Sequence, residues 1–149
     1  MFNTGLRALL AILALSFTLA PGLPAAAPQD KDELADLIKA GFETLAKKSV
    51  EEAVGKWLKD SPAEPDSAQV AGPLEQVVSL YGPADGSDIV KSASLTGRIR
   101  VVYAVSYHAK GPCYYKFRCF RTTKGSWIVT HLGFNLDLDQ VIPESMYGK

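Results

Sequence analysis

The 149-residue chain has no net charge, because its 16 Lys and Arg residues balance its 16 Asp and Glu residues. A neutral chain creates no long-range field toward nucleic acid or an anionic membrane, so we expect neither as a partner of the mature protein. Cysteine is also scarce: with two residues, the chain is not a small domain built on several disulfides. The length suits one domain of common size and excludes an enzyme with a separate cofactor domain.

Motifs for the common catalytic and cofactor chemistries are missing as well. The sequence contains no C-x-x-C pair, no glycine-rich phosphate loop, no G-x-S-x-G and no H-E-x-x-H. Its two histidines, His108 and His131, do not have the spacing of paired zinc ligands. We therefore expect no metal and no cofactor.

The first feature that is present is an apolar run near the N-terminus. Residues 8–20 (ALLAILALSFTLA) follow Arg7, and Pro21 and Gly22 end the run. This is the layout of a secretory signal peptide, and the run is shorter than the ~20 apolar residues that span a bilayer. We predict that residues 1–27 direct export to the periplasm or the outside of the cell, and that residues 28–149 form one domain. Cleavage anywhere between residues 20 and 27, or retention as an anchor, stays open.

Three helices are predicted to open this domain. The first has Asp30 as its cap, with Glu33 three residues later, and carries an apolar stripe of Leu34, Leu37, Ile38, Phe42 and Leu45. Ser49 and Glu52 predict the start of the second, whose stripe is Val50, Ala53, Val54, Trp57 and Leu58. Residues 60–72 are rich in Pro, Ser and Asp and predict a loop. The third helix is expected to begin at Pro73 and to end before Gly82.

Alternation with a period of two replaces the helical pattern after residue 88. It predicts four strands, at residues 89–96, 98–109, 113–122 and 127–135, with short turns between them. Consecutive strands with short connections pair as an antiparallel meander. Helices followed by a meander predict an α+β domain whose N-terminal helices pack on one face of a curved sheet.

The strand pattern also predicts which side chains face the helices. Lys116 and Arg118 mark the solvent side of their strand, so the alternating Cys113, Tyr115, Phe117 and Cys119 should face inward. By the same alternation we expect an aromatic, partly polar set beneath the helices: Tyr103, Tyr107, Tyr115, Trp127 and His131. We interpret such a set first as dense core packing; a small-ligand pocket with aromatic walls is the alternative. His108, beside a turn, is expected in solvent.

Other polar residues have weaker interpretations. Cys113 and Cys119 lie ~20 Å apart if both are on one strand, beyond the ~7 Å that a disulfide tolerates. We interpret them as small, half-buried apolar residues; a local bend that permits a bridge, or a link between two chains, is the alternative. Asp137 and Asp139 are too few for a calcium site. A basic cluster is interpreted as a solvated sheet face, with a weak anion or partner site as the alternative: Arg98, Arg100, Lys116, Arg118 and Arg121.

Several segments together resemble the nuclear transport factor two-like (cystatin-like) superfamily. They are the helix with Phe42, residues 49–53 (SVEEA), residues 80–83 (LYGP) and residues 125–129 (GSWIV) at the entry to the last strand. The resemblance covers residues 30–138 and implies a curved antiparallel sheet wrapped around N-terminal helices, with a cone-shaped cavity. It implies no particular activity, since the isomerases of this superfamily need an Asp base and the three strongest strands contain no Asp.

We therefore predict an exported, non-catalytic domain that binds a small apolar ligand or a protein partner. The outer sheet face, with Tyr114 and Phe120 among charged residues, also suits a sheet-to-sheet homodimer. The alternative is a small cavity enzyme, an isomerase or dehydratase, with His131 as base and Tyr103 or Tyr115 as proton donor.

Overall fold

The computed structural model describes residues 32–148. Three helices precede four strands: α1 (Glu33–Lys47), α2 (Val50–Leu58), α3 (Ser67–Tyr81), β1 (Ala84–Thr96), β2 (Ile99–His108), β3 (Gly111–Arg121) and β4 (Trp127–Asn135). This order confirms the predicted α+β domain with helices N-terminal to an antiparallel sheet. The predicted signal peptide, residues 1–27, lies outside the described residues.

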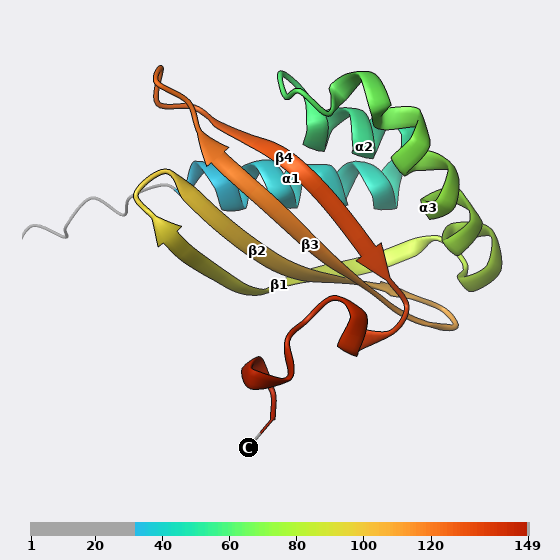
Figure 1. Ribbon diagram of the computed structural model, residues 1–149. Helices are drawn as coiled ribbons and strands as arrows, with labels where there is room; N and C mark the ends of the chain where they lie inside the picture. The colour runs from blue at the N-terminus through green and yellow to red at the C-terminus, as the bar shows by residue number, and fades with distance from the viewer. Residues whose placement is uncertain (1–31, 149) are drawn as a thin grey trace, which may run out of the picture. The chain divides into compact units, whose positions relative to one another are not determined.

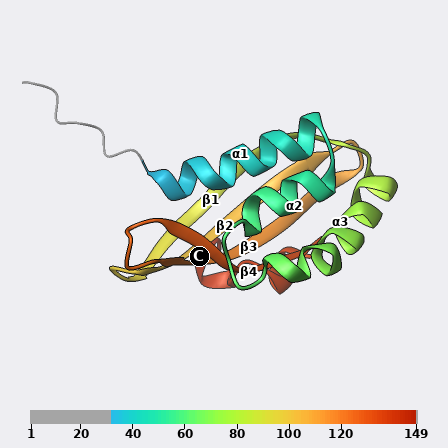
Figure 2. The ribbon, with the colours of Figure 1, turned by 90° about the horizontal axis from the view of Figure 1, so that it is seen from above.

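Side-chain caps begin α1 and α2. The Asp32 carboxylate accepts a hydrogen bond from the Ala35 N–H at 3.3 Å, so the cap of α1 is Asp32 and the prediction of Asp30 was wrong. The Ser49 hydroxyl accepts from the Glu52 N–H at 3.1 Å, as predicted. Because only two residues separate the helices, α2 folds back against α1 (Figure 2).

α3 starts at Ser67, six residues before the predicted start at Pro73. The composition of residues 60–72 indicates a loop, but the structure has one only up to a short 3-10 turn, Glu64–Asp66. The six added residues bring Ala71 into the buried core and Val70 against it, alongside Leu74 and Val77 of the predicted part. Pro73 is exposed inside the helix, where its missing N–H leaves one backbone hydrogen bond unmade.

The four strands form one antiparallel sheet in the order β1–β2–β3–β4, which confirms the meander. β4 has the predicted bounds, whereas β1 begins at Ala84, five residues before the predicted start. The register of β1 against β2 slips three times. Each slip is a bulge that reverses the alternation of side chains, which explains the weak period of two in this segment.

The helices lie over one face of the sheet (Figures 1 and 2), and four aromatic rings pack between the two layers. Phe42 of α1 lies edge-on to Trp57 of α2, with ring centroids 4.9 Å apart, and to Tyr115 of β3 at 5.0 Å. Phe117 of β3 completes the cluster, 5.4 Å from Trp57. None of the four side chains is more than 3% exposed. The core therefore lies between the helices and the centre of β3.

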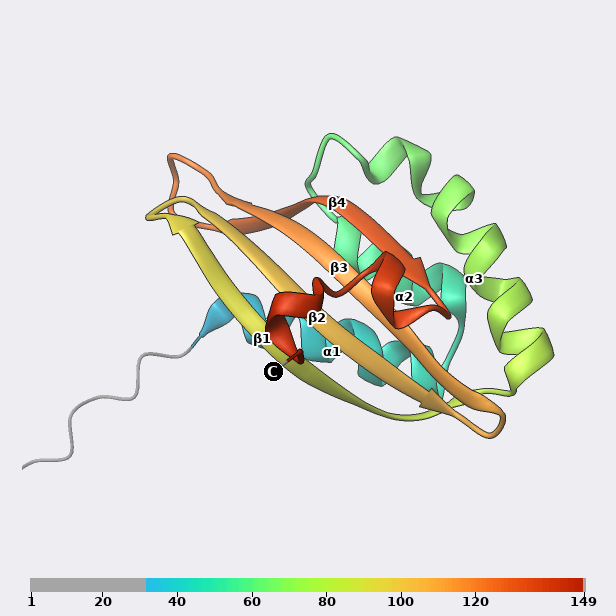
Figure 3. The same cartoon turned by 60° about the horizontal axis from the view of Figure 1, so that its bottom comes forward.

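The opposite face of the sheet, called the outer face below, is partly covered by the C-terminal segment, residues 136–148 (Figures 1 and 3). This segment leaves the end of β4 and crosses the sheet by way of two 3-10 turns, Leu138–Gln140 and Glu144–Met146. Val141 and Ile142 are buried against Val101 and Tyr103 of β2. As a result, the middle of β2 is buried on both of its faces.

Candidate functional site

The register between β2 and β3 decides which side chains face the helices. Val102 pairs with Phe117, and Ala104 pairs with Tyr115. Directly paired residues in an antiparallel sheet point to the same face, so Tyr103 and Tyr107 belong to the outer face. The prediction that these two tyrosines point toward the helices was therefore wrong.

A single residue in the connecting turn accounts for this error. The prediction placed a three-residue turn at residues 110–112, whereas the structure has a two-residue turn that pairs His108 with Gly111. Changing the turn length by one residue reverses the face of every side chain on β2 relative to β3.

The predicted aromatic set is thus divided between the two faces. Tyr115 and Trp127 pack in or against the helix-side core. His131 pairs with Arg118 on the outer face and is exposed, so its predicted inward position was wrong. Tyr115 and His131, the pair of the enzyme alternative, lie on opposite faces and are not brought together. On the helix side, four buried rings fill the space in which the alternative interpretation placed an aromatic-walled pocket.

A chain of buried hydrogen bonds lies at the edge of this core, next to the C-terminal end of α3. His108 Nδ1 lies 2.7 Å from the Gly82 carbonyl, and His108 Nε2 lies 2.8 Å from Ser106 Oγ. Because a carbonyl can only accept, Nδ1 carries a proton; in the tautomer with this proton alone, Nε2 accepts the Ser106 hydroxyl proton. The Tyr115 hydroxyl, 3.0 Å away, then donates to Ser106 Oγ. In this tautomer each of the three protons has one acceptor.

Sequence reasoning missed this chain and placed His108 in solvent, whereas only 7% of its surface is exposed. The overlooked signal is the two-residue spacing of Ser106 and His108, which puts both on one face of β2. The geometry matches a nucleophile and its base. Ser106 is fully buried, however, and its oxygen also accepts from Tyr115, so the chain fixes the end of β2 against Gly82.

The two cysteines are free thiols on the helix-side face of β3. They are fully buried rather than half-buried, at 0% and 1% exposure for Cys113 and Cys119. Burial raises the pKa of the Cys113 thiol to about 11 and that of the Cys119 thiol to about 12. Both thiols are therefore protonated and shielded at neutral pH.

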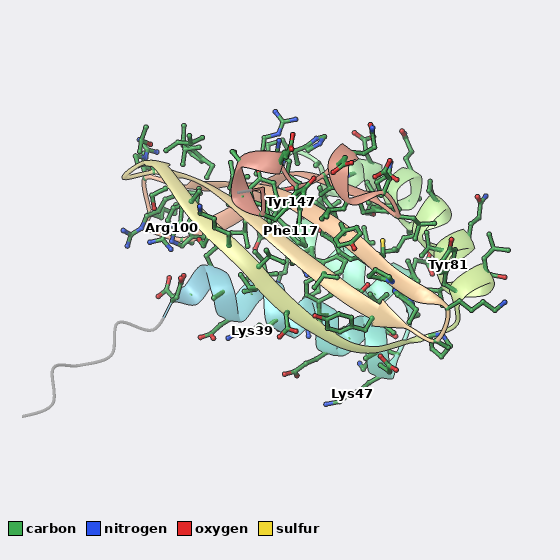
Figure 4. All side chains as sticks on the ribbon, turned by 90° about the horizontal axis from the view of Figure 1, so that it is seen from below. Lys39, Lys47, Tyr81, Arg100, Phe117 and Tyr147 are labelled. Atoms are coloured by element: carbon green, nitrogen blue, oxygen red, sulfur yellow. The ribbon has the colours of Figure 1, made fainter. Side chains whose placement is uncertain are left out.

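An open pocket lies on the outer face, between the sheet and the C-terminal segment, with a volume of about 330 Å³. One wall comes from the sheet: Val90, Val105, Tyr107, Pro112 and Tyr114. The other wall comes from the C-terminal segment: Leu138, Ile142, Met146 and Tyr147. We call this the outer-face pocket. Figure 4 shows Tyr147 over the middle of the sheet.

Three apolar side chains at this pocket stay open to solvent: Val90 is 50% exposed, Tyr107 42% and Tyr147 45%. Two phenol groups there are held by carboxylates. The Tyr107 hydroxyl donates to Asp88 at 2.8 Å, and the Tyr147 hydroxyl donates to Asp139. The hydrogen bond to Asp88 raises the pKa of Tyr107, and that to Asp139 raises the pKa of Tyr147 to about 12. Both rings are thereby oriented, with their oxygens available as acceptors.

The outer face beyond the pocket is basic. His131 lies there beside Arg118 and Lys116, and its pKa is lowered, first by partial burial and then by these two cations. The C-terminal segment packs against Tyr114, while Phe120 lies under the Arg98 guanidinium at 4.7 Å from its ring centroid. The homodimer expected through this face stays a prediction.

Within residues 32–148, His, Cys, Asp and Glu side chains form no group of three or more placed to hold a metal ion. The helices of this same part of the chain are all too short or too polar to cross a membrane. The chain matches no family model, and neither a curated protein nor a solved structure is significantly similar to it.

Proposed function

We propose that this chain is an exported, non-catalytic domain that binds a small, largely apolar molecule in the outer-face pocket. The observation that carries the proposal is the pocket of about 330 Å³, whose two walls come from different parts of the chain. Ligand sites occupy roughly 300–1,000 Å³ and combine apolar walls with a few placed polar groups. The outer-face pocket lies at the small end of that range.

The exposure of the pocket side chains supports a ligand. Val90, Tyr107 and Tyr147 leave apolar surface in water at one place, and covering it would gain roughly 25 cal/mol for each Å² removed from water. The phenol oxygens of Tyr107 and Tyr147 accept hydrogen bonds, since their own protons are directed at Asp88 and Asp139. A compact ring or short chain with one hydrogen-bond donor fits this lining best.

Export and membership of the nuclear transport factor two-like superfamily belong to the same proposal. The apolar run at residues 8–20 supports export. Helices that precede a four-stranded antiparallel sheet support the superfamily. The proposed ligand site differs from the cavity that the resemblance implies, because it lies on the face away from the helices.

The neutral fluorescent probe N-phenyl-1-naphthylamine tests the pocket without involving the basic surface. Val90→Trp should fill the pocket and weaken probe binding about tenfold or more, because the indole takes the space of the ligand. Leu80→Trp is the matched control: it lies on α3, away from the pocket, is 64% exposed, and should leave the affinity within about twofold. Equal affinities for both variants would exclude the outer-face pocket as the site.

A further inference from the structure

Charge is unevenly distributed along this neutral chain. From Ile89 to Leu136 the sequence contains eight Lys and Arg residues and no Asp or Glu. That stretch makes up most of the sheet. At physiological salt a charge acts over about 8 Å, so a binding partner responds to the charges of the surface it contacts rather than to the net charge of the chain. The expectation that a neutral chain avoids anionic membranes therefore does not hold for every surface.

Four cations gather at the end of the sheet where the β1–β2 turn lies beside the β3–β4 turn (Figures 1 and 3). Arg98 Nε donates to the Arg121 carbonyl at 3.0 Å, and the Arg121 N–H donates to the Arg98 carbonyl at 2.8 Å. Lys124 lies in the adjoining turn, and Arg118 lies three residue pairs further along the sheet, opposite Val101. In Figure 4, Arg100 marks this end and Tyr81 marks the opposite one.

Carboxylates do not neutralise these cations. Within the described residues, no Asp or Glu forms an ion pair with Arg98, Arg118, Arg121 or Lys124. Asp32 is paired with Arg100 at 3.1 Å, on the helix side. Asp60 borders the hollow that includes Lys124 without pairing with it. The surface is therefore an uncompensated positive patch.

Aliphatic side chains are exposed among the same cations. Leu95 is 68% exposed and Ile99 is 40% exposed, on either side of the β1–β2 turn. Leu95 is the extra residue of a bulge, so no residue of β2 pairs with it. We call this surface the basic end, made of Leu95, Arg98, Ile99, Arg118, Phe120, Arg121 and Lys124. Cations beside projecting aliphatic groups match an interface with charged headgroups over a hydrocarbon layer.

We propose that the basic end docks on an anionic lipid bilayer. The cations contact the headgroups, and Leu95 and Ile99 enter the boundary between headgroups and acyl chains. An acidic peptide or a nucleic acid would engage the cations, but it would leave these exposed aliphatic side chains without an apolar environment. The site is separate from the outer-face pocket, so either proposal can fail without the other.

A fluorophore placed in the full chain tests this proposal directly. Leu95→Cys is labelled with an iodoacetamide derivative of nitrobenzoxadiazole; Leu80→Cys, at a leucine 64% exposed on α3, is the matched control. Cys113 and Cys119 are buried and protonated, so they do not react in the folded protein. With vesicles of equal parts phosphatidylglycerol and phosphatidylcholine, the label at position 95 should brighten and shift to the blue. The label at position 80 should not.

Charge variants show whether lipid binding depends on the basic end or on the net charge of the protein. Adding Arg118→Gln and Lys124→Gln to the position-95 protein should raise the lipid concentration needed for a half-maximal response about 25-fold, or about fivefold for each cation. Lys39→Gln with Lys47→Gln removes the same net charge from α1, where Figure 4 places both lysines. This pair should change the lipid concentration for a half-maximal response less than about twofold. Equal responses at both labels, or with pure phosphatidylcholine, would overturn the proposal. So would an equal response to soluble polyglutamate, which would indicate an acidic polypeptide partner.

Discussion

Ser106 Oγ is the middle member of the buried chain Tyr115–Ser106–His108 and hydrogen-bonds both of its neighbours. Ser106→Ala would leave His108 Nε2 and the Tyr115 hydroxyl unpaired in the core. We expect it to lower the free energy of unfolding by about 2 kcal/mol, because a buried polar group without a partner costs roughly 1–3 kcal/mol.

Tyr115→Phe is the matched comparison, since it removes the first donor and leaves the Ser106–His108 bond intact. Its expected cost is about 1 kcal/mol. Urea unfolding at neutral pH measures both changes. A larger loss for Tyr115→Phe than for Ser106→Ala would show that the chain does not run in the direction given above.

His131 should make the fold less stable in mild acid. Its folded pKa lies below the ordinary 6.5 because of partial burial, Arg118 and Lys116. In the window between the folded pKa and 6.5, the unfolded chain binds a proton that the folded chain does not. The contribution of this residue to stability is therefore complete above that window and falls as the pH drops through it.

The measurement is an NMR titration of the His131 ring together with unfolding at pH 5 and pH 8. The wild-type pKa should lie below 6.5, and Arg118→Gln should raise it. His131→Gln should reduce the loss of stability between the two pH values. A ring that titrates at or above 6.5 would contradict the electrostatic description of this face.

At the scale of elements, the crossing of α1 and α2 depends on a missing side chain. The Trp57 indole donates to the Ile38 carbonyl at 3.0 Å, and a Cβ on Gly41 would lie only 1.9 Å from its Nε1. Gly41→Ala should therefore displace Trp57 from the core and cost about 3 kcal/mol, at the upper end of typical overpacking effects.

Gly55→Ala provides the control within the same helix pair. A Cβ at Gly55 of α2 would meet no atom within 4 Å, so the change should stabilise the protein by roughly 0.5–1 kcal/mol through helix propensity. Chemical denaturation of both variants gives the comparison. Similar losses for the two glycines would show that the helices do not approach each other as closely as the structure has them.

Local signals in the sequence are sufficient for some elements. The cap at Ser49, the bounds of β4 and the order of the meander follow from residues close in the chain. The start of α3 was not predictable in the same way, because packing on α2 outweighs the proline and glycine in the first half of that helix.

The faces of β2 were harder to predict for a different reason. Alternation identifies the inner face of a strand only when the other face is solvated. Val101, Val102, Tyr103 and Ala104 are all buried, because the C-terminal segment covers the outer face. A two-residue turn after His108 would have settled the register, but a three-residue turn fits the sequence equally well.

At the scale of the whole molecule, the sheet separates two environments. Its helix side is filled by rings and a closed hydrogen-bond chain, whereas its outer side keeps an open pocket. The turns at one end of the sheet carry the open basic end. The candidate site was predicted only in part: Tyr107 was expected at a ligand site and lines the outer-face pocket. The C-terminal wall was missed, because no short-range pattern shows that residues 136–148 return across the sheet.

The central claim is that the ligand site lies on the outer face, and a methyl NMR titration with N-phenyl-1-naphthylamine tests it most directly. The aromatic probe should shift the methyl signals of Val90, Ile142 and Met146, which line the outer-face pocket. The methyl signals of Leu34, Val54 and Val129, in the helix-side core, should stay in place. Shifts confined to the helix-side methyl groups would contradict the account and place the ligand between the helices and the sheet.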